Sequence, residues 1–284
     1  MARMSWKEAC QLDTSLVSLD SFFHRAPEFA QTLTGGLTNR CWKVVLPSGQ
    51  AYVWRPITPI TKAFSISRHQ EYQILKAIEP SGIAPAPSLV NDQGLLVEWV
   101  DGEALHQGMA VASLVETLAA VHDLDIHRIP VAPFNFTARV DHYWMQLDSE
   151  RKTERVTDIY QRWRSAPNLR DVGKVLCHFD LAGYNLVATQ TGTRVIDWEY
   201  ASLADPRLDL TLTIGAADLP MLEAIQLYCQ QRDIREWDDW VEGVMAWQPR
   251  TQMMAMLWYL LAHQLWGEES YGLAAQQLEA SFCS

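Results

Sequence analysis

Hydrophobic and polar residues follow different periods in the two parts of this chain. Over the first 100 residues, short segments that alternate or are continuously apolar predict strands, because the side chains of a strand point to opposite faces in turn. These segments cover residues 29–33, 41–46, 51–56 and 95–100. One longer stretch, residues 65–78, has the spacing of a helix. The first part is therefore predicted to be β-rich, with one clear helix.

The spacing becomes helical from residue 109 onward. Residues 109–122 place Val111, Leu114 and Leu118 on one face of a helix. Further helices are predicted over residues 141–163, 219–231, 237–265 and 271–282. Pro249 is a candidate break in the third of these. Strand-like segments return only within residues 175–197, so the second part is predicted to be mostly helical.

No repeat or low-complexity linker separates the two parts. A boundary near Gly102 would therefore be set by topology and not by a flexible tether. The pattern predicts an α+β fold with an N-terminal lobe over residues 1–101 and a C-terminal lobe over residues 102–284.

The candidate chemistry lies in residues 176–210, where His178, Asp180 and Asn185 have the spacing H-x-D-x-x-x-x-N. A turn at residues 190–192 and a β-branched run then lead to Asp197 at a strand end. Phosphoryl transfer needs one carboxylate to orient a hydroxyl, and further oxygen ligands to hold Mg²⁺. We expect Asp180, Asn185 and Asp197 on adjoining loops, close enough to share a metal. The alternative is that Asn185 and Asp197 are turn residues and that His178 is a hydrogen-bonded core histidine. The presence of the complete set of residues favours the functional site.

The run CHFDLAGYNLV…RVIDWEYA resembles the signature of the aminoglycoside phosphotransferase/choline kinase superfamily. Its I-D-W-E-Y-A form is closer to the choline kinase and thiamine kinase branches. The resemblance implies a protein-kinase-like bilobal fold, with ATP and Mg²⁺ as cofactors and a small-molecule hydroxyl as acceptor. It also implies that Asp180 is the catalytic base and that Asn185 and Asp197 bind Mg²⁺. By the same resemblance, Glu199 lies near the metals or the substrate, and Tyr200 lies at the acceptor pocket.

The first part of the chain offers candidate nucleotide contacts. Glycines at 35 and 36 would let backbone N–H groups approach phosphate, although a glycine pair alone equally fits a hairpin turn. The form G-G-L-T-N resembles the phosphate loop of choline-kinase-type enzymes, which assigns Gly35, Gly36, Thr38 and Asn39 to the nucleotide.

Arg55 ends the strand over residues 51–56, where the protein-kinase pattern has a lysine. We expect it to bind phosphate and to pair with Glu71 of the predicted helix, the alternative being two solvated surface charges. The backbone of residues 98–100, including Glu98 and Val100, is expected to recognise adenine.

Composition limits the possible partners. Among 284 residues, 48% are hydrophobic, yet no window has the ~18 consecutive apolar residues of a membrane helix. Five scattered cysteines without a C-x-x-C pair predict reduced thiols in a cytoplasmic protein. A net charge of −11 without a basic stripe argues against nucleic acid and fits a cationic acceptor.

The helical part is rich in tryptophan, and aromatic faces attract quaternary ammonium groups and other soft cations. Most of these rings are expected in the core. Tyr200, Trp258 and Trp266 are the candidates for substrate contact, by comparison with choline-kinase-like enzymes. Asp209 and His122 are expected to have structural roles.

The preferred function is thus an ATP-dependent kinase for a primary hydroxyl of a cationic alcohol, thiamine or choline. An aminoglycoside O-phosphotransferase would need an acidic acceptor pocket, and a non-catalytic nucleotide-binding pseudokinase would not need Asp180, Asn185 and Asp197 together. A metal-dependent hydrolase built on His178 and Asp180 would need additional histidines as metal ligands, and this motif does not supply them. The sequence leaves the acceptor, ATP versus GTP and the oligomeric state open.

Overall fold

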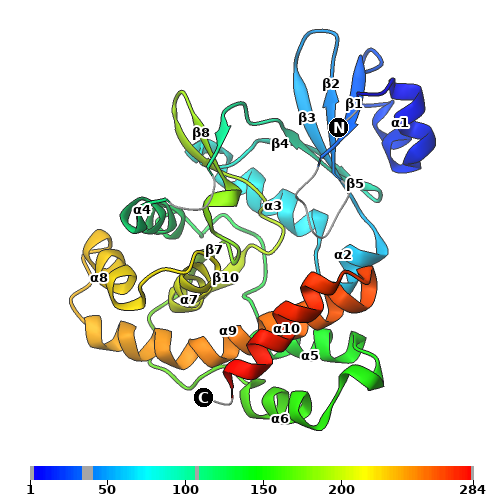
Figure 1. Cartoon of the computed structure of the whole chain (residues 1–284). Coiled ribbons are helices and arrows are strands. Elements are labelled where there is room, and N and C mark those ends of the chain that lie inside the picture. The colour runs from blue at the N-terminus through cyan, green and yellow to red at the C-terminus, as the bar shows by residue number, and fades with distance from the viewer. Residues whose placement is uncertain (1–2, 34–40, 106–108, 283–284) are drawn as a thin grey trace.

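The computed structural model describes residues 3–33, 41–105 and 109–282 of the chain. Its N-terminal lobe is built on a five-stranded antiparallel sheet with the order β1-β2-β3-β5-β4. The strands are β1 (Phe29–Thr32), β2 (Trp42–Val45), β3 (Ala51–Pro56), β4 (Pro87–Asn91) and β5 (Gly94–Glu98). The helical elements of this lobe are α1 (Trp6–Leu12), η1 (Thr14–Leu19), α2 (Pro59–Ala63), α3 (Arg68–Ile78) and η2 (Glu79–Ser81). Figure 1 shows this sheet above a larger helical lobe.

Successive side chains of β3 point to opposite faces of the sheet, so one face packs into a core and the other borders a cavity. Tyr52 and Trp54 pack into a core cluster beneath α1 and η1, where the Trp54 Nε1–H donates to Ser15 Oγ at 2.9 Å. Val53 and Arg55 point to the opposite face and line a cavity. The alternation of this strand thereby delivers Arg55 toward the second lobe.

The C-terminal lobe combines helices with two small sheets. The helices are α4 (Val111–His122), α5 (Phe136–Gln146), η3 (Ser149–Arg151), α6 (Glu154–Trp163), α7 (Pro206–Ala216), α8 (Met221–Gln231), α9 (Trp237–Trp266) and α10 (Glu269–Ser281). The strands are β6 (Glu103–Ala104), β7 (Val175–Cys177), β8 (Leu186–Thr189), β9 (Gly192–Val195) and β10 (Ser202–Ala204), with η4 (Gly183–Asn185) between β7 and β8. β6, β8 and β9 form one sheet and β10 pairs with β7. The α+β, bilobal prediction is confirmed.

Several details differ from the sequence prediction. The stretch 141–163 is not one helix but α5 and α6, because the backbone becomes extended at Leu147 and Thr153 caps a new helix. Helix α7 was not predicted, although Asp205 as N-cap and Pro206 at its first turn are start signals. Strand β10 was also not predicted, since three residues are too few to show a period.

Pro249 does not break α9, which is continuous over 30 residues. A proline in a helix leaves a carbonyl without its usual N–H donor. Neighbouring side chains add hydrogen bonds here, since Arg250 Nη1 donates to the Ala246 carbonyl at 2.7 Å and Thr251 Oγ1 donates to that of Gln248 at 2.9 Å. Among the described helices, including this longest one, none combines the length and apolarity needed to cross a membrane.

Candidate active site

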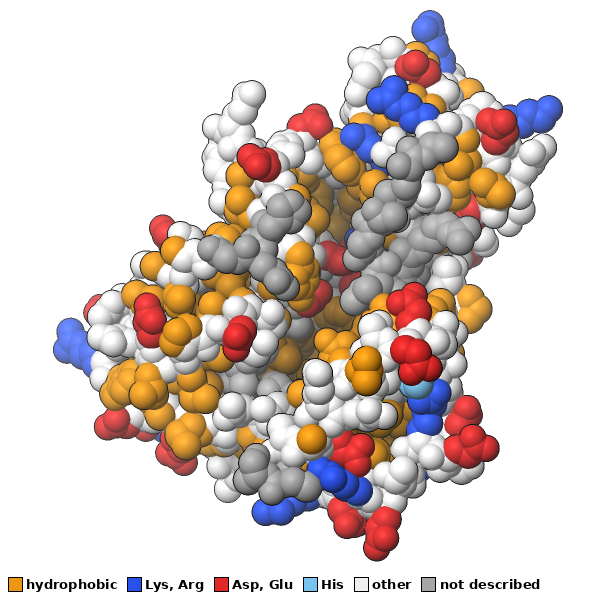
Figure 2. Space-filling model, viewed as in Figure 1, with side chains coloured by type: hydrophobic (Ala, Val, Ile, Leu, Met, Phe, Trp, Pro, Cys, Tyr) orange, Lys and Arg blue, Asp and Glu red, His pale blue; other side chains and the backbone are white. Residues whose placement is uncertain are grey.

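A cavity of about 820 Å³ lies between the two lobes. Figure 2 shows this hollow, with apolar walls and acidic side chains inside it. Its lining includes these residues predicted from the sequence: Arg55, Glu71, Glu98, Val100, Asp180, Asn185, Asp197, Glu199, Tyr200 and Trp258. Gly35, Gly36, Thr38 and Asn39 lie outside the described residues. Trp266 does not line the cavity. It stacks on Phe64, with 5.5 Å between ring centroids, and lies behind Trp258.

The loop after β7 is fixed by a buried carboxylate. Asp209 of α7 is fully buried and accepts hydrogen bonds from the backbone N–H groups of His178, at 2.7 Å, and Phe179, at 2.8 Å. Phe179 has a left-handed backbone with a φ of 68°, which is rare for a residue with a bulky side chain. Asp209 also contacts His122 Nε2 at 3.0 Å, and His122 Nδ1 lies 2.6 Å from the Tyr228 hydroxyl. The structural roles expected for Asp209 and His122 fit these contacts.

His178 is a second fixed point of the same loop. Its Nε2 lies 3.0 Å from the Ile196 carbonyl, and its Nδ1 accepts from the backbone N–H of Asp180 at 3.3 Å. Burial lowers the pKa of this imidazole, which therefore stays neutral. The histidine ties the strand end before Asp180 to the strand end before Asp197.

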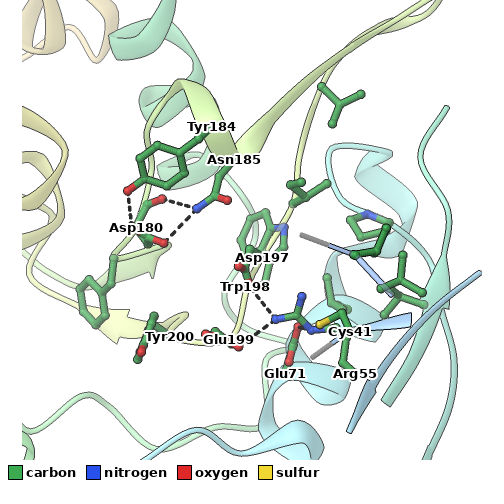
Figure 3. A pocket seen from close by; sticks show the side chains of 18 of the residues that line it. Cys41, Arg55, Glu71, Asp180, Tyr184, Asn185, Asp197, Trp198, Glu199 and Tyr200 are labelled. Carbon is green, nitrogen blue, oxygen red and sulfur yellow. Dashed lines mark hydrogen bonds and ion pairs between the residues drawn. The ribbon is translucent and has the colours of Figure 1, made fainter. Parts of the chain in front are cut away.

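Asp180 has both carboxylate oxygens occupied by donors. Oδ2 accepts from Asn185 Nδ2 at 3.0 Å, and Oδ1 accepts from the Tyr184 hydroxyl at 2.6 Å (Figure 3). Burial raises the pKa of Asp180 to about 7, with a further contribution from the negative charge of Asp197 and opposed by the Tyr184 hydrogen bond. A carboxyl with such a pKa is suited to exchange a proton near neutral pH.

Asp197 follows β9 in a left-handed conformation, with a φ of 64°. Burial alone would raise its pKa, but the ion pair with Arg55 outweighs burial and lowers the pKa of this carboxyl. Asn185 directs its amide nitrogen to Asp180, so its carbonyl oxygen is left for another ligand on the side of Asp197 (Figure 3). A carboxylate and an amide oxygen are the donor types that Mg²⁺ prefers, so these residues fit the metal.

An ion network connects both lobes below this point. Arg55 Nε lies 3.0 Å from Glu71 Oε1, and Arg55 Nη2 lies 2.9 Å from Glu199 Oε2. Arg68 Nη1 lies 2.6 Å from Glu71 Oε2 and 3.0 Å from Glu199 Oε2. The predicted proximity of Arg55 and Glu71 is thus present. Because two guanidinium groups bind Glu199 Oε2, this oxygen is not left for a metal.

Arg68 was not predicted as part of the site, although its side chain is completely buried within the network. A signal existed, because Arg68 and Glu71 are three residues apart on a predicted helix and therefore share a face. Charged side chains that fold into an interior normally need partners, and one partner of Arg68, Glu199, comes from a distant part of the chain.

One part of the cavity is apolar and lies beneath the sheet and the segment between the lobes. It is lined by Val53, Leu75, Val97, Trp99, Val100, Val187 and Ile196. The Glu98 side chain accepts from the backbone N–H of Ala86 at 3.3 Å and lies 3.4 Å from Arg194, so it faces the rim. Apolar walls beside exposed backbone are suited to a planar heterocycle.

The other part of the cavity is aromatic and is bounded by helices of the C-terminal lobe. Trp258 Nε1–H donates to the Tyr200 hydroxyl at 3.0 Å, which joins two of the predicted acceptor residues. Sequence reasoning missed other lining residues of this part, among them Phe134, Arg139, Tyr143, Phe179, Tyr184 and Tyr259. Only Tyr184 carried a signal, since it directly precedes Asn185.

A β-rich lobe over a helical lobe, with these carboxylates and an amide at the seam, defines a phosphotransferase of the protein-kinase-like class. Residues 30–241 match the model of the phosphotransferase enzyme family, APH. The chain belongs to this family and is a small-molecule kinase.

Relatives and solved structures are similar over nearly the whole chain. A thiamine kinase of Escherichia coli O17:K52:H18 is 26% identical over 252 residues, which are 88% of this chain and 87% of that protein. An ethanolamine kinase of Plasmodium vivax has a TM-score of 0.73 at 17% identity, covering 98% of this chain and 89% of that one. A choline kinase of Streptococcus pneumoniae has a TM-score of 0.70 at 17% identity, covering 95% and 99%. The superfamily and branches suggested by the sequence are confirmed.

Proposed function

We propose that this kinase transfers the γ-phosphoryl group of ATP to the primary hydroxyl of thiamine, with choline as the alternative acceptor. The observation that carries the proposal is the convergence of Asp180, Asn185 and Asp197 on one cavity between the lobes. Thiamine is preferred to choline because the relative named a thiamine kinase is similar in sequence along 88% of this chain. The choline and ethanolamine kinases are similar in fold, at lower identity.

The proposed roles follow from the two parts of the cavity. Adenine would lie in the apolar part against the backbone of residues 98–100, and Arg55 would face the phosphates from β3. The acceptor would lie in the aromatic part with its hydroxyl at Asp180. The lobe boundary at residues 101/102 would then separate nucleotide-binding from acceptor-binding elements.

The unpaired cysteines among the described residues fit the expected reducing cytoplasm.

Asp180 would accept a hydrogen bond from the acceptor hydroxyl and orient its oxygen toward the γ-phosphorus. Its pKa of about 7 allows it to take the hydroxyl proton as the new O–P bond forms and ADP leaves. Asn185 and Asp197 would hold Mg²⁺, which when bound neutralises charge on the phosphate oxygens. Asp209 and His178 would keep the Asp180 backbone in place, so that most of the acceleration comes from positioning.

An acceptor screen tests the proposal. The purified protein is incubated with ATP, Mg²⁺ and, separately, thiamine, choline, ethanolamine, methylthioribose or kanamycin, and phosphorylated product is measured. We expect turnover with thiamine or choline and none without divalent metal. Turnover with kanamycin alone would replace the proposal by the aminoglycoside function.

Two substitutions test the roles of the carboxylates. Asp180→Ala and Asp197→Ala should each lower kcat by about a hundredfold or more. Asp239→Ala is the matched control, because Asp239 pairs with Arg170 at 2.9 Å on the surface of the C-terminal lobe. A near-normal kcat in either cavity variant, with its fold intact, would refute the role of that residue.

A further inference from the structure

The lining of the cavity carries both signs of charge. Asp180 and Asp197 are lining carboxylates, and Arg139 of α5 is a lining cation among aromatic rings. An acceptor in the cavity therefore meets carboxylates and a guanidinium that come from different elements.

Arg139 is held by ring faces. Its guanidinium carbon lies 5.3 Å from the centroid of Phe134, 6.0 Å from that of Tyr143 and 5.9 Å from that of Tyr200. Its only side-chain hydrogen bond in the described part of the chain is a long one, 3.4 Å from Nη1 to the Tyr143 hydroxyl. Most of its donors are thus not used by those residues.

Within residues 3–33, 41–105 and 109–282, no carboxylate forms an ion pair with Arg139, which distinguishes it from the lining residue Arg55 and from Arg68 behind it. Arg55 binds three carboxylates and Arg68 binds two. Asp141, two residues after Arg139, is already paired with Arg164 at 2.6 Å. An arginine that lines a cavity without a partner is a ready donor for a ligand.

The same geometry disfavours a quaternary ammonium in this position. Three of the aromatic faces that would attract such a cation are within cation–π distance of Arg139. A second permanent cation among them would meet a like charge. Phe134, Tyr143 and Tyr200 therefore surround the protein's own cation.

We propose that Arg139 determines acceptor specificity: it donates hydrogen bonds to an accepting group of the acceptor other than the reacting hydroxyl, a group that choline lacks. The inference rests on the proposed small-alcohol kinase function and narrows its substrate class. Thiamine has this bipartite chemistry, with a thiazolium beside its hydroxyethyl group and a neutral pyrimidine whose ring nitrogens accept hydrogen bonds. Choline has no group beyond its ammonium.

The test compares acceptors of different length on substituted enzymes. Arg139→Met should raise the KM for thiamine about tenfold or more, because a hydrogen bond from a charged group is lost, while kcat and the KM for ATP stay unchanged. The KM for 3-methyl-5-(2-hydroxyethyl)-4-methylthiazolium, which keeps the cation and hydroxyl but lacks the pyrimidine, should change less than twofold.

Arg162→Met is the matched control, since Arg162 lies over Trp163, 5.2 Å from its centroid, and does not line the cavity. The inference is overturned if Arg139→Met leaves the thiamine KM unchanged, or raises that of the thiazolium alcohol equally. If the unsubstituted protein does not phosphorylate thiamine, the proposed substrate fails, and Arg139 is then judged on the acceptor found in the screen. An acceptor without a second accepting group, such as choline, overturns the inference, whereas a tenfold KM effect on another acceptor supports it.

Discussion

The hydroxyl of Tyr184 lies 2.6 Å from Oδ1 of Asp180, the carboxylate to which an acceptor hydroxyl would also donate (Figure 3). Tyr184 is 46% exposed, so its ring can move without disturbing the core. The tyrosine therefore competes with the acceptor for Asp180 and at the same time stabilises the charged form of this carboxyl.

Tyr184→Phe should consequently change two quantities. The KM for the acceptor should fall about threefold to tenfold, because no internal hydrogen bond must be exchanged. The acidic limb of the pH profile of kcat/KM should move to higher pH, since the Tyr184 hydrogen bond lowers the pKa of Asp180. Tyr160→Phe is the control, because Tyr160 donates to Asp141 at the same distance, 2.6 Å, outside the cavity. An unmoved pH profile in Tyr184→Phe would contradict this role.

The pKa of Asp180 also predicts how stability depends on pH. The folded protein holds a proton on this carboxyl up to about pH 7, whereas the unfolded chain releases it near the ordinary aspartate pKa of 3.8. The folded state thus binds more protons between these values, and the contribution of Asp180 to stability falls as pH rises through that window. Asp180→Asn should exceed the unsubstituted protein in melting temperature by a much larger margin at pH 7 than at pH 4. Equal differences at both pH values, measured by calorimetry, would argue against a raised pKa.

Removing Arg55 should destabilise the fold as well as abolish activity. Arg55→Met leaves Glu71, Asp197 and Glu199 without their shared cation, and breaking a buried ion pair on one side costs about 3–5 kcal/mol. Urea unfolding measures this loss. The double variant Arg55→Met, Glu199→Gln should recover part of it, because one uncompensated charge is removed. A loss below about 1 kcal/mol would show that solvent reaches these carboxylates.

Substitution of Asp209 should lower kcat, although this buried residue does not contact the substrate. Asp209→Asn replaces one of the two oxygens that accept the N–H groups of His178 and Phe179, so the loop that carries Asp180 loses a fixed point. A small displacement of a catalytic group costs up to about a hundredfold in rate, and we expect kcat to fall tenfold to a hundredfold. The KM for ATP should stay within twofold, because the apolar walls are not altered. Unchanged kcat in a folded Asp209→Asn protein would be the contrary result.

The sequence predicted the parts of the site that local chemistry determines. The spacing of Asp180, Asn185 and Asp197 follows from one turn and one ribbon, so neighbouring residues are sufficient to place them. Their proximity in one cavity agrees with the prediction, while their catalytic and metal-binding roles remain predictions. The lobes and their order could be predicted because strand and helix periods are local properties.

The residues that were not predicted depend on contacts between distant segments. Arg68 binds Glu199, which lies 131 positions later in the chain. Arg139 of α5 contacts the ring of Tyr200, which directly precedes the segment that leads into β10. No periodicity in a single segment shows such a pairing. Trp266 illustrates the converse, since its position near the end of α9 directs the ring to Phe64 and not to the cavity. Which face of a helix borders a cavity is decided by packing, and packing involves the whole lobe.

The segment between β5 and β6 limits how the lobes can move. At Gly102, a Cβ atom would lie 2.2 Å from the Ala188 carbonyl oxygen, so the chain is pressed against β8 and enters the C-terminal lobe there. The Val195 N–H donates to the Ile83 carbonyl at 2.7 Å, which attaches the loop after α3 to the same ribbon. The ion pairs from Arg55 and Arg68 to Glu199 add further attachment on this side of the sheet. β1 and β2 form the opposite edge, so any tilt of the sheet that admits the nucleotide should displace these two strands most.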